Sequence, residues 1–176
     1  PGKTIVGGLL GGWIGVEVVK GYFGMTRRTG DTYVLPLIFG IALGRVGCFL
    51  TGLADHTYGV ATSLPWAVDF GDGVLRHPTQ LYESLFLLLS GVLLFGLRHR
   101  LQRQGLMFRA FMGLYLSFRL GVECIKPSLK IYGGLSAIQW ACLAGLGALA
   151  YSLWRMYQRV PAVEGLGVVA EHKVSG

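Results

Sequence analysis

The stretch RHPTQLYESLFLLLSGVLLFGL occupies residues 76–97 and combines two properties that rarely occur together. Its larger part is apolar and is about as long as the 20 residues that a helix needs to cross the hydrocarbon core of a bilayer. Its first part brings Gln80, Tyr82 and Glu83 into the beginning of that helix. Polar and ionisable groups are costly in a membrane and usually mark function. The stretch therefore predicts a membrane helix with a polar site at one end.

The composition extends this prediction to the whole chain. Hydrophobic residues make up 52% of the 176 residues and charged residues only 14%, whereas a soluble domain carries about 25% charge. The net charge of +7 comes from basic residues at the ends of apolar runs. Because there is no separate basic domain, we expect no nucleic-acid partner. The three cysteines form no CxxC pair, so the sequence predicts neither a metal site nor a cofactor.

Five apolar segments predict an all-α, polytopic membrane protein. The segments cover residues 4–19, 33–50, 79–97, 106–124 and 135–154. Residues 1–159 are expected to form one transmembrane domain, with residues 51–78 as an extracytoplasmic head loop. The sequence from 160 to 176 has no sustained periodicity and is expected to be a disordered cytoplasmic tail. The chain has no initiator methionine, and we expect it to lack an N-terminal portion.

The loops between the segments predict the orientation in the membrane. The basic residues follow the first, third and fifth segments, and the long loop between the second and third segments contains three aspartates. By the positive-inside rule the basic loops are cytoplasmic and the long loop lies outside. The basic residues are Lys20, Arg27, Arg28, Arg98, Arg100, Arg103, Arg155 and Arg159, and the aspartates are Asp55, Asp69 and Asp72.

This topology places ionisable groups of three helices at one depth, near the outer leaflet. Arg45 comes from the second segment, Gln80 and Glu83 from the third, and Arg119 and Glu123 from the fourth. Spacings of three and four residues put each pair on one helix face. These groups could simply pair internally and fix the bundle. The alternative is a ligand site, and two arginines suit a lipid phosphate because guanidinium makes forked hydrogen bonds to it.

Several motifs resemble the prolipoprotein diacylglyceryl transferase family. The stretch GRVGCFLTG, residues 44–52, resembles the family signature GRxGNFxNGE, and RHPTQLYES, residues 76–84, resembles RHPSQLYE. FRLGVECIKP, residues 118–127, is similar to FRxxxEFxRxP. GKTIVGGLLGG, residues 2–12, resembles HGGLLG, and GGLSAIQ, residues 133–139, is similar to the stretch that opens the last family helix. The motifs occur in family order.

The resemblance implies a fold and a reaction. Family members are bacterial inner-membrane proteins of seven helices, with a site open to the extracytoplasmic side and to the bilayer. They transfer the diacylglyceryl group of the membrane lipid phosphatidylglycerol to the cysteine thiol of a prolipoprotein lipobox peptide. A thioether forms and glycerol phosphate leaves. The resemblance therefore implies two further helices before the first segment of this chain.

Residue roles follow from the matching motif positions. Arg45 and Arg119 are expected to hold the phosphate, Glu123 to orient it, and His77 to accept the thiol proton. Gly59 is expected to permit a turn in the head loop. The positions expected to bind substrate are Gly7, Gly8, Gly47, Cys48, Gly52, Gly59, Gln80, Tyr82 and Glu83.

The chain also departs from the family pattern. Val6 replaces the histidine before the Gly-Gly pair, and Cys48 replaces the first asparagine of the signature. Thr51 replaces the second asparagine and Leu53 the glutamate, although Asp55 could supply a carboxylate nearby. These departures leave open a second hypothesis, a non-catalytic or altered-specificity lipid-binding homologue. A third, a transporter or channel, is less consistent with polar groups confined to one leaflet, because transporter sites lie near the midplane.

Overall fold

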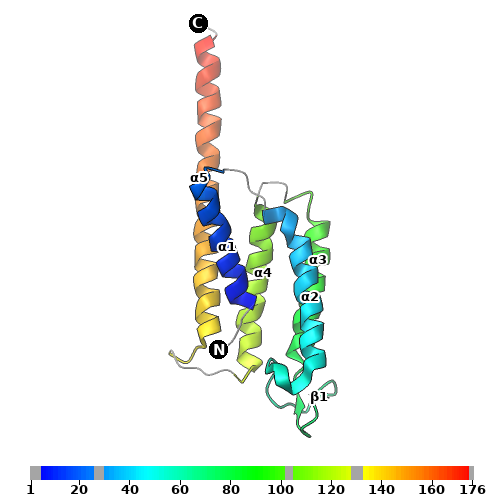
Figure 1. The fold of residues 1–176 in the computed structure, drawn as a ribbon. Helices are drawn as coiled ribbons and strands as arrows, with labels where there is room; N and C mark the ends of the chain where they lie inside the picture. Colours follow the sequence, from blue (N-terminus) through cyan, green and yellow to red (C-terminus); the bar gives the residue numbers. More distant parts are fainter. Residues whose placement is uncertain (1–4, 26–29, 102–104, 128–132, 175–176) are drawn as a thin grey trace.

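The computed structural model describes residues 5–25, 30–101, 105–127 and 133–174. Over these residues the fold is a bundle of α-helices with a small head at one end (Figure 1). Each of the five predicted segments corresponds to a helix, which confirms the all-α class. The helices are α1 Ile5–Tyr22, α2 Val34–Thr51, α3 Thr79–Gly96, α4 Leu106–Val122 and α5 Ala137–Val174.

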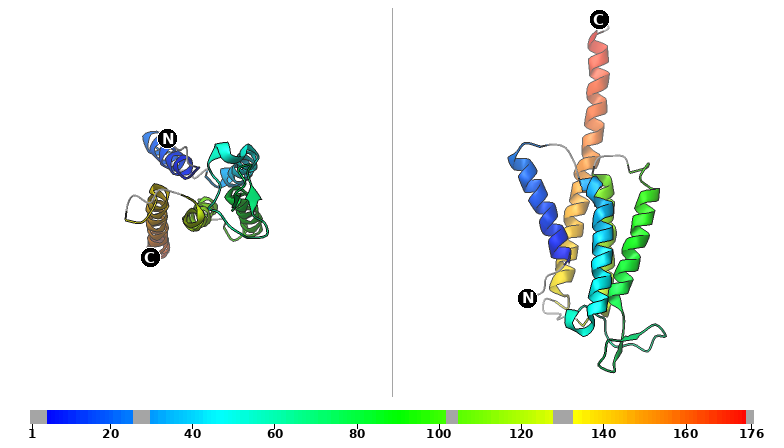
Figure 2. Two further views of the ribbon diagram at one scale, coloured as in Figure 1. Left: turned by 90° about the horizontal axis from the view of Figure 1, so that it is seen from below. Right: turned by 45° about the vertical axis from the view of Figure 1, so that its right-hand side comes forward.

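The helices form two groups that share α4. Seen along the bundle, α2 and α3 lie together on one side of α4, and α1 and α5 lie on the other (Figure 2). The packing follows this layout: α2 contacts α3, α4 contacts both α3 and α5, and α1 contacts α5. The helix α4 therefore carries residues that can reach both groups.

Three of the described helical stretches are long and apolar enough to cross a membrane: Gly30–Asp55, Thr79–Gly96 and Ala137–Gln158. The helix α4 has 17 residues, including Arg109 and Arg119, and α1 carries Glu17 and Lys20. The prediction that all five segments span the bilayer therefore stays a prediction. The outer faces of α2 and α3 support a lipid environment, because their large apolar side chains point away from the protein. Phe39, Leu43, Leu50 and Val92 are each more than 65% exposed.

Small residues bring α2 and α3 close together. The Ser84 hydroxyl donates a hydrogen bond of 2.9 Å to the backbone carbonyl of Ala42. Farther along the pair, a side chain at Gly91 would meet Ile38, since a Cβ atom there would lie 3.2 Å from Ile38 Cγ2. Small residues that permit close backbone approach are typical of packed membrane helices. This contact sets Arg45 of α2 beside Glu83 of α3.

Local signals explain where α4 and α5 begin. The carboxylate of Asp31, in the 3-10 helix η1 Gly30–Tyr33, accepts hydrogen bonds from the backbone N–H groups of Gly105 and Phe108 at 2.5 and 2.8 Å. It thereby satisfies donors that have no partner within α4. At α5, the N-cap Ser136 and Gln139 exchange hydrogen bonds between side chain and backbone, as in a capping box.

The head lies at the end of the bundle where α2 ends and α3 begins (Figure 1). It contains the 3-10 helix η2 Gly52–Asp55 and a short antiparallel hairpin, with β1 Val68–Asp69 paired to β2 Leu75–Arg76. The Asp69 carboxylate accepts three backbone hydrogen bonds within the hairpin turn. The head is tied to the end of α4 because the Val60 N–H donates to the carbonyl of Ile125 at 2.9 Å.

The division into a transmembrane domain, residues 1–159, and a disordered tail, residues 160–176, stays a prediction. The helix α5 continues to Val174 and projects beyond the rest of the bundle (Figure 1). Once a helix exists, each added residue gains a backbone hydrogen bond without the cost of a new nucleus. The stretch consists largely of Ala, Val, Leu and Glu and extends the helix past Pro161. Its cytoplasmic location stays a prediction.

Candidate functional site

Glu83 is the centre of a buried cluster of charged side chains. Arg45 Nε lies 2.8 Å from Glu83 Oε2, and Arg119 Nη1 donates to the same oxygen at 3.2 Å. Arg119 Nη2 also reaches Glu123 Oε2 at 3.5 Å. All four residues are 5% exposed or less. The structure brings these residues of three segments together, whereas their location at the outer leaflet and their roles stay predictions.

Two hydroxyl groups complete the contacts of the two carboxylates. The Tyr115 hydroxyl donates to Glu83 Oε1 at 2.6 Å, and the Ser136 hydroxyl donates to Glu123 Oε1 at 3.1 Å. Sequence reasoning missed both residues. Tyr115 could have been found, because it precedes Arg119 by four residues and therefore shares its helix face. Ser136 comes from the start of α5, and no sequence spacing links it to Glu123.

Some donors in this buried region have no protein acceptor. Among the described residues, Arg119 Nε and both polar atoms of the Gln80 amide make no hydrogen bond with the protein. Arg45 Nε is close to Glu83 but is not aligned for a hydrogen bond. Gln80 is 1% exposed and precedes Glu83 by one helical turn. A buried polar group without a partner costs free energy, so each of these atoms favours a bound ligand or water that can pair with it.

His77 lies in a different set of contacts. Its Nδ1 is 3.2 Å from the Tyr82 hydroxyl, which also accepts a hydrogen bond of 2.8 Å from the Trp66 indole. Both His77 and Tyr82 are half-buried. The structure thus joins two of the predicted site residues to each other at the base of the head. Their described contacts do not include the four charged residues.

Position 59 requires glycine for a reason other than the predicted turn. Its backbone does not adopt the positive φ that favours glycine. Instead, a Cβ atom at Gly59 would lie 2.7 Å from His77 Cβ, 2.9 Å from Thr79 Cγ2 and 3.0 Å from the Ile125 carbonyl oxygen. The site needs glycine because three segments approach it too closely for any side chain. A sequence pattern does not reveal such an approach.

Of the predicted residues at the end of α2, Cys48 lies beside the cluster. Arg45 Nη1 is 3.9 Å from the half-buried Sγ of Cys48. Gly52 ends α2 with a φ of 68°, which a residue with a side chain rarely adopts. Gly47 is exposed, and its carbonyl accepts a hydrogen bond of 2.9 Å from the Thr51 hydroxyl.

Two other positions that depart from the family pattern, Val6 and Leu53, lie in other parts of the fold. Val6 is 1% exposed and belongs to the hydrophobic core. Leu53 lies in η2, where the Asp55 carboxylate accepts a hydrogen bond from the Thr57 hydroxyl. His56 is exposed and has a positive φ of 53°. The described contacts of Asp55 therefore stay within the head.

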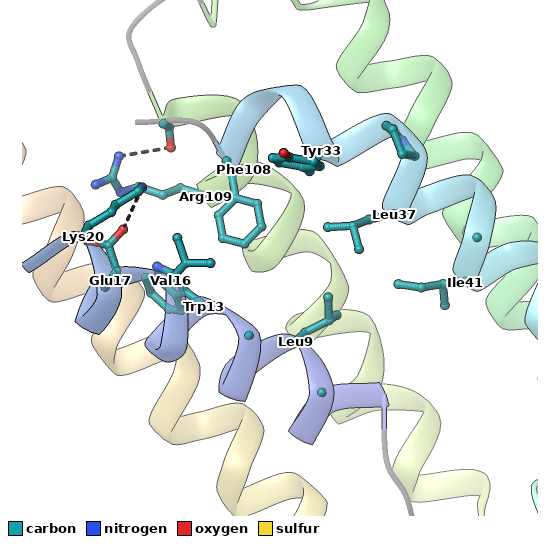
Figure 3. Close-up of a pocket in the computed structure, with 16 residues that line it drawn as sticks. Leu9, Trp13, Val16, Glu17, Lys20, Tyr33, Leu37, Ile41, Phe108 and Arg109 are labelled. Atoms are coloured by element: carbon teal, nitrogen blue, oxygen red, sulfur yellow. Dashed lines mark hydrogen bonds and ion pairs between the residues drawn. The ribbon is translucent and has the colours of Figure 1, made fainter. Parts of the chain in front are cut away.

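Gly7 and Gly8 lie on α1. Gly8 lines an apolar groove between α1 and α2. The groove has a volume of about 590 Å³ (Figure 3). Leu9, Trp13, Leu37 and Phe108 line its wall, and the paired Glu17 and Lys20 lie toward one end. The side chains of the charged cluster do not line it. The structure therefore does not unite Gly8 with the arginine residues predicted to bind substrate.

Comparison with known proteins identifies the family. The family described as prolipoprotein diacylglyceryl transferase matches residues 2–155. The chain belongs to the prolipoprotein diacylglyceryl transferase family. No solved structure is significantly similar to it.

Relatives in this family carry the name phosphatidylglycerol–prolipoprotein diacylglyceryl transferase. The protein of Solidesulfovibrio magneticus is 35% identical over 170 residues, which cover 86% of this chain and 60% of the relative. The protein of Methylobacillus flagellatus is 37% identical over 166 residues, with 82% and 60% covered. The protein of Clostridioides difficile is 31% identical over 142 residues, with 81% and 54% covered. The chain thus spans little more than half the length of these relatives.

Proposed function

We propose that the protein transfers the diacylglyceryl group of phosphatidylglycerol to the lipobox cysteine thiol of a prolipoprotein. Family membership and the names of the relatives support this substrate pair. The observation that carries the proposal is the buried cluster around Glu83, in which two guanidinium groups from separate helices converge. We assign the lipid phosphate to this cluster.

The free hydrogen-bonding capacity of the cluster suits an anion. A guanidinium group has five N–H donors, and two carboxylates cannot occupy all the donors of Arg45 and Arg119. Arg119 Nε and the Gln80 amide are buried and unpaired within the described residues. Phosphate oxygens can accept from Arg119 Nε and Gln80 Nε2. Glu83 and Glu123 keep the arginine side chains in place by ion pairs.

The arrangement favours departure of the phosphate. In the reaction, the thiolate sulfur forms a bond to the terminal glyceryl carbon, and the bond from that carbon to the phosphate oxygen breaks. The electron pair of the broken bond stays on the leaving glycerol phosphate. Cationic donors that are fixed before the reaction stabilise this charge without reorganisation. Arg45 and Arg119 are such donors because packing and ion pairs hold them inside the bundle.

The thiol must lose its proton, because the thiolate is the nucleophile. We assign this proton to His77, whose imidazole lies with Tyr82 at the junction of the head and α3. Val6 is an apolar core residue and cannot accept a proton. The Tyr82 hydroxyl is positioned by the Trp66 indole and in turn orients the His77 ring.

We further propose that the protein resides in the bacterial inner membrane with the head on the extracytoplasmic side. Lys20 at the end of α1 and Arg98 and Arg100 after α3 belong to the end of the bundle opposite the head (Figure 1). This distribution agrees with the positive-inside rule. The site would then open where the lipobox peptide emerges from the membrane.

The proposed function is tested by expressing the protein in cells depleted of their own prolipoprotein diacylglyceryl transferase. Extracts of these cells are examined for a diacylglyceryl thioether on a reporter prolipoprotein. The proposal expects modified reporter and renewed growth. A stable, membrane-inserted protein that yields only unmodified reporter would contradict the assignment. If that protein still binds phosphatidylglycerol, the non-catalytic lipid-binding hypothesis replaces it.

A further inference from the structure

Lys126 lies immediately beyond the charged cluster but is not part of any ion pair described above. It follows the 3-10 helix η3 Glu123–Ile125, and its N–H donates to the Glu123 carbonyl at 3.4 Å. Lys126 therefore directly follows the turn whose Glu123 carboxylate contacts Arg119.

The surroundings of Lys126 limit its contact with water. Its side chain is half-buried. The preceding residue, Ile125, accepts a hydrogen bond from the Val60 N–H of the head and approaches Gly59 closely. The segment that carries Lys126 is therefore held between the end of α4 and the head, and the charges of the cluster act on its ammonium group.

The charge balance of this region leaves a cation without a counter-charge. Lys126 adds a third cation to Arg45 and Arg119, whereas Glu83 and Glu123 are the two anions. Both carboxylates already contact arginine, and within the described residues Lys126 forms no ion pair. The group therefore carries one net positive charge when Lys126 is protonated.

The electrostatic environment of Lys126 agrees with this balance. Burial, followed by repulsion from Arg119 and Arg45, lowers the pKa of Lys126 from 10.5 to about 8, although Glu83 and Glu123 partly oppose the shift. These charged groups come from α2, α3, α4 and η3. In the adjoining head, His77 approaches Gly59 on the side of the Ile125 carbonyl. Protonated Lys126 is thus destabilised in the empty site.

We propose that Lys126 is a third cationic contact for the phosphate held by Arg45 and Arg119, and that it binds this anion only in its protonated form. This inference rests on the proposed function, because it assigns a further residue to the same phosphate. A bound phosphate supplies the missing negative charge and stabilises the ammonium. Binding of the anion and binding of the proton therefore support each other.

The direction of the pH dependence follows from this coupling. Below pH 8 Lys126 is largely protonated and the anion binds at full strength. Above pH 8 the free protein loses this proton, and binding must first restore it. Affinity for the anion should then fall by up to about tenfold for each further pH unit, until the pKa in the complex is reached.

The experiment measures equilibrium binding of radiolabelled phosphatidylglycerol to the protein in phosphatidylcholine nanodiscs between pH 6.5 and 9.5. The unsubstituted protein should bind more weakly above pH 8. Lys126→Arg should bind at every pH without this decline, because arginine stays protonated. Lys126→Gln should bind about 10- to 100-fold more weakly at pH 7 and also show no decline. Lys20→Gln, at the opposite end of the bundle, should match the unsubstituted protein.

Competition with glycerol phosphate identifies what Lys126 recognises. If glycerol phosphate displaces the lipid in the unsubstituted protein and more weakly in Lys126→Gln, the contact is to phosphate. If Lys126→Arg and Lys126→Gln both keep the pH dependence of the unsubstituted protein, the inference is wrong. If Lys126→Gln does not fold, the same result for folded Lys126→Arg is sufficient.

Transfer to a lipobox peptide separates this inference from its main competitor and from the proposed function. Transfer that rises through pH 8 and disappears in Lys126→Arg, while lipid binding persists, would show that Lys126 accepts the thiol proton, and the anion contact would be wrong. If no form of the protein catalyses transfer but the pH-dependent binding follows Lys126, the proposed function fails and the phosphate contact stands.

Discussion

Glu83 holds three side chains in place with one carboxylate. Arg45 and Arg119 meet one of its oxygens and the Tyr115 hydroxyl meets the other. Buried charges are expensive to desolvate, and a buried ion pair frequently adds little stability compared with apolar residues. Removing one partner is nevertheless costly because the remaining charge stays buried. The cluster is therefore better explained by ligand binding than by stability.

Tyr115→Phe tests how tightly Glu83 is held. The change removes one hydrogen bond to a buried carboxylate and should lower the free energy of unfolding by about 1–2 kcal/mol. Unfolding in mixed detergent micelles measures this value. Tyr151→Phe is the matched control, since Tyr151 is 56% exposed on α5 and should change stability little. Equal effects of both substitutions would argue against the Tyr115 contact.

The sequence revealed the charged residues but not all their partners. Helical spacing places Arg119 and Glu123 on one face of the fourth predicted segment, and Gln80 and Glu83 on one face of the third. That each pair shares a face could therefore be predicted once the segments were assigned. Contacts such as Ser136 with Glu123 depend on how the beginning of α5 approaches the end of α4. A spacing within one helix contains no information about that approach.

The head contacts the ends of α3 and α4 closely at Gly59. Gly59→Ala places a Cβ atom within 3.0 Å of His77, Thr79 and the Ile125 carbonyl. The head must then shift, and we expect a loss of about 1–3 kcal/mol in stability, as in overpacked cores. Gly147→Ala, in α5, meets no atom within 4 Å. It should be neutral or stabilising by up to about 1 kcal/mol.

Both variants are compared by detergent unfolding and by limited proteolysis of the head loop. Faster cleavage in Gly59→Ala, with no change in Gly147→Ala, is the expected pattern. Identical stability and cleavage in the two variants would show that the head does not depend on this close approach.

The lengths of the apolar segments predicted the helices, but they predicted the first and last residues of the helices less well. The beginning of α3 agrees with the predicted segment at residue 79, since Pro78 precedes it and a long apolar run follows its polar first turns. The sequence pattern after residue 159 is irregular and by itself does not predict where α5 ends. Helix propagation requires only that each residue tolerate the helix, whereas sequence periodicity detects packing against a neighbour.

The bundle as a whole has a chemical asymmetry between its two ends, which the proposed orientation explains. A cysteine at Asp72, exposed in the head, should react with a membrane-impermeant maleimide in intact spheroplasts. The substitution removes a surface ion pair with Arg76 and a hydrogen bond from the Val74 N–H, and surface contacts of this kind contribute little to stability. Arg100→Cys, in the exposed turn after α3, should react only after permeabilisation. The unsubstituted protein supplies the background from its three cysteines, and the reverse labelling pattern would contradict the orientation.

The central claim is that the guanidinium groups around Glu83 bind and stabilise the phosphate of the lipid donor. The most direct measurement compares phosphatidylglycerol binding and transfer to a lipobox peptide for Arg119→Ala and Arg119→Lys, with unfolding as the control for folding. Arg119→Ala should lower the transfer rate about 10²–10³-fold, the usual effect of removing one fixed hydrogen-bond donor. Arg119→Lys should recover part of the binding and rate, because it keeps the charge but loses the fork. A folded Arg119→Ala protein with unchanged lipid binding and unchanged transfer would contradict the account.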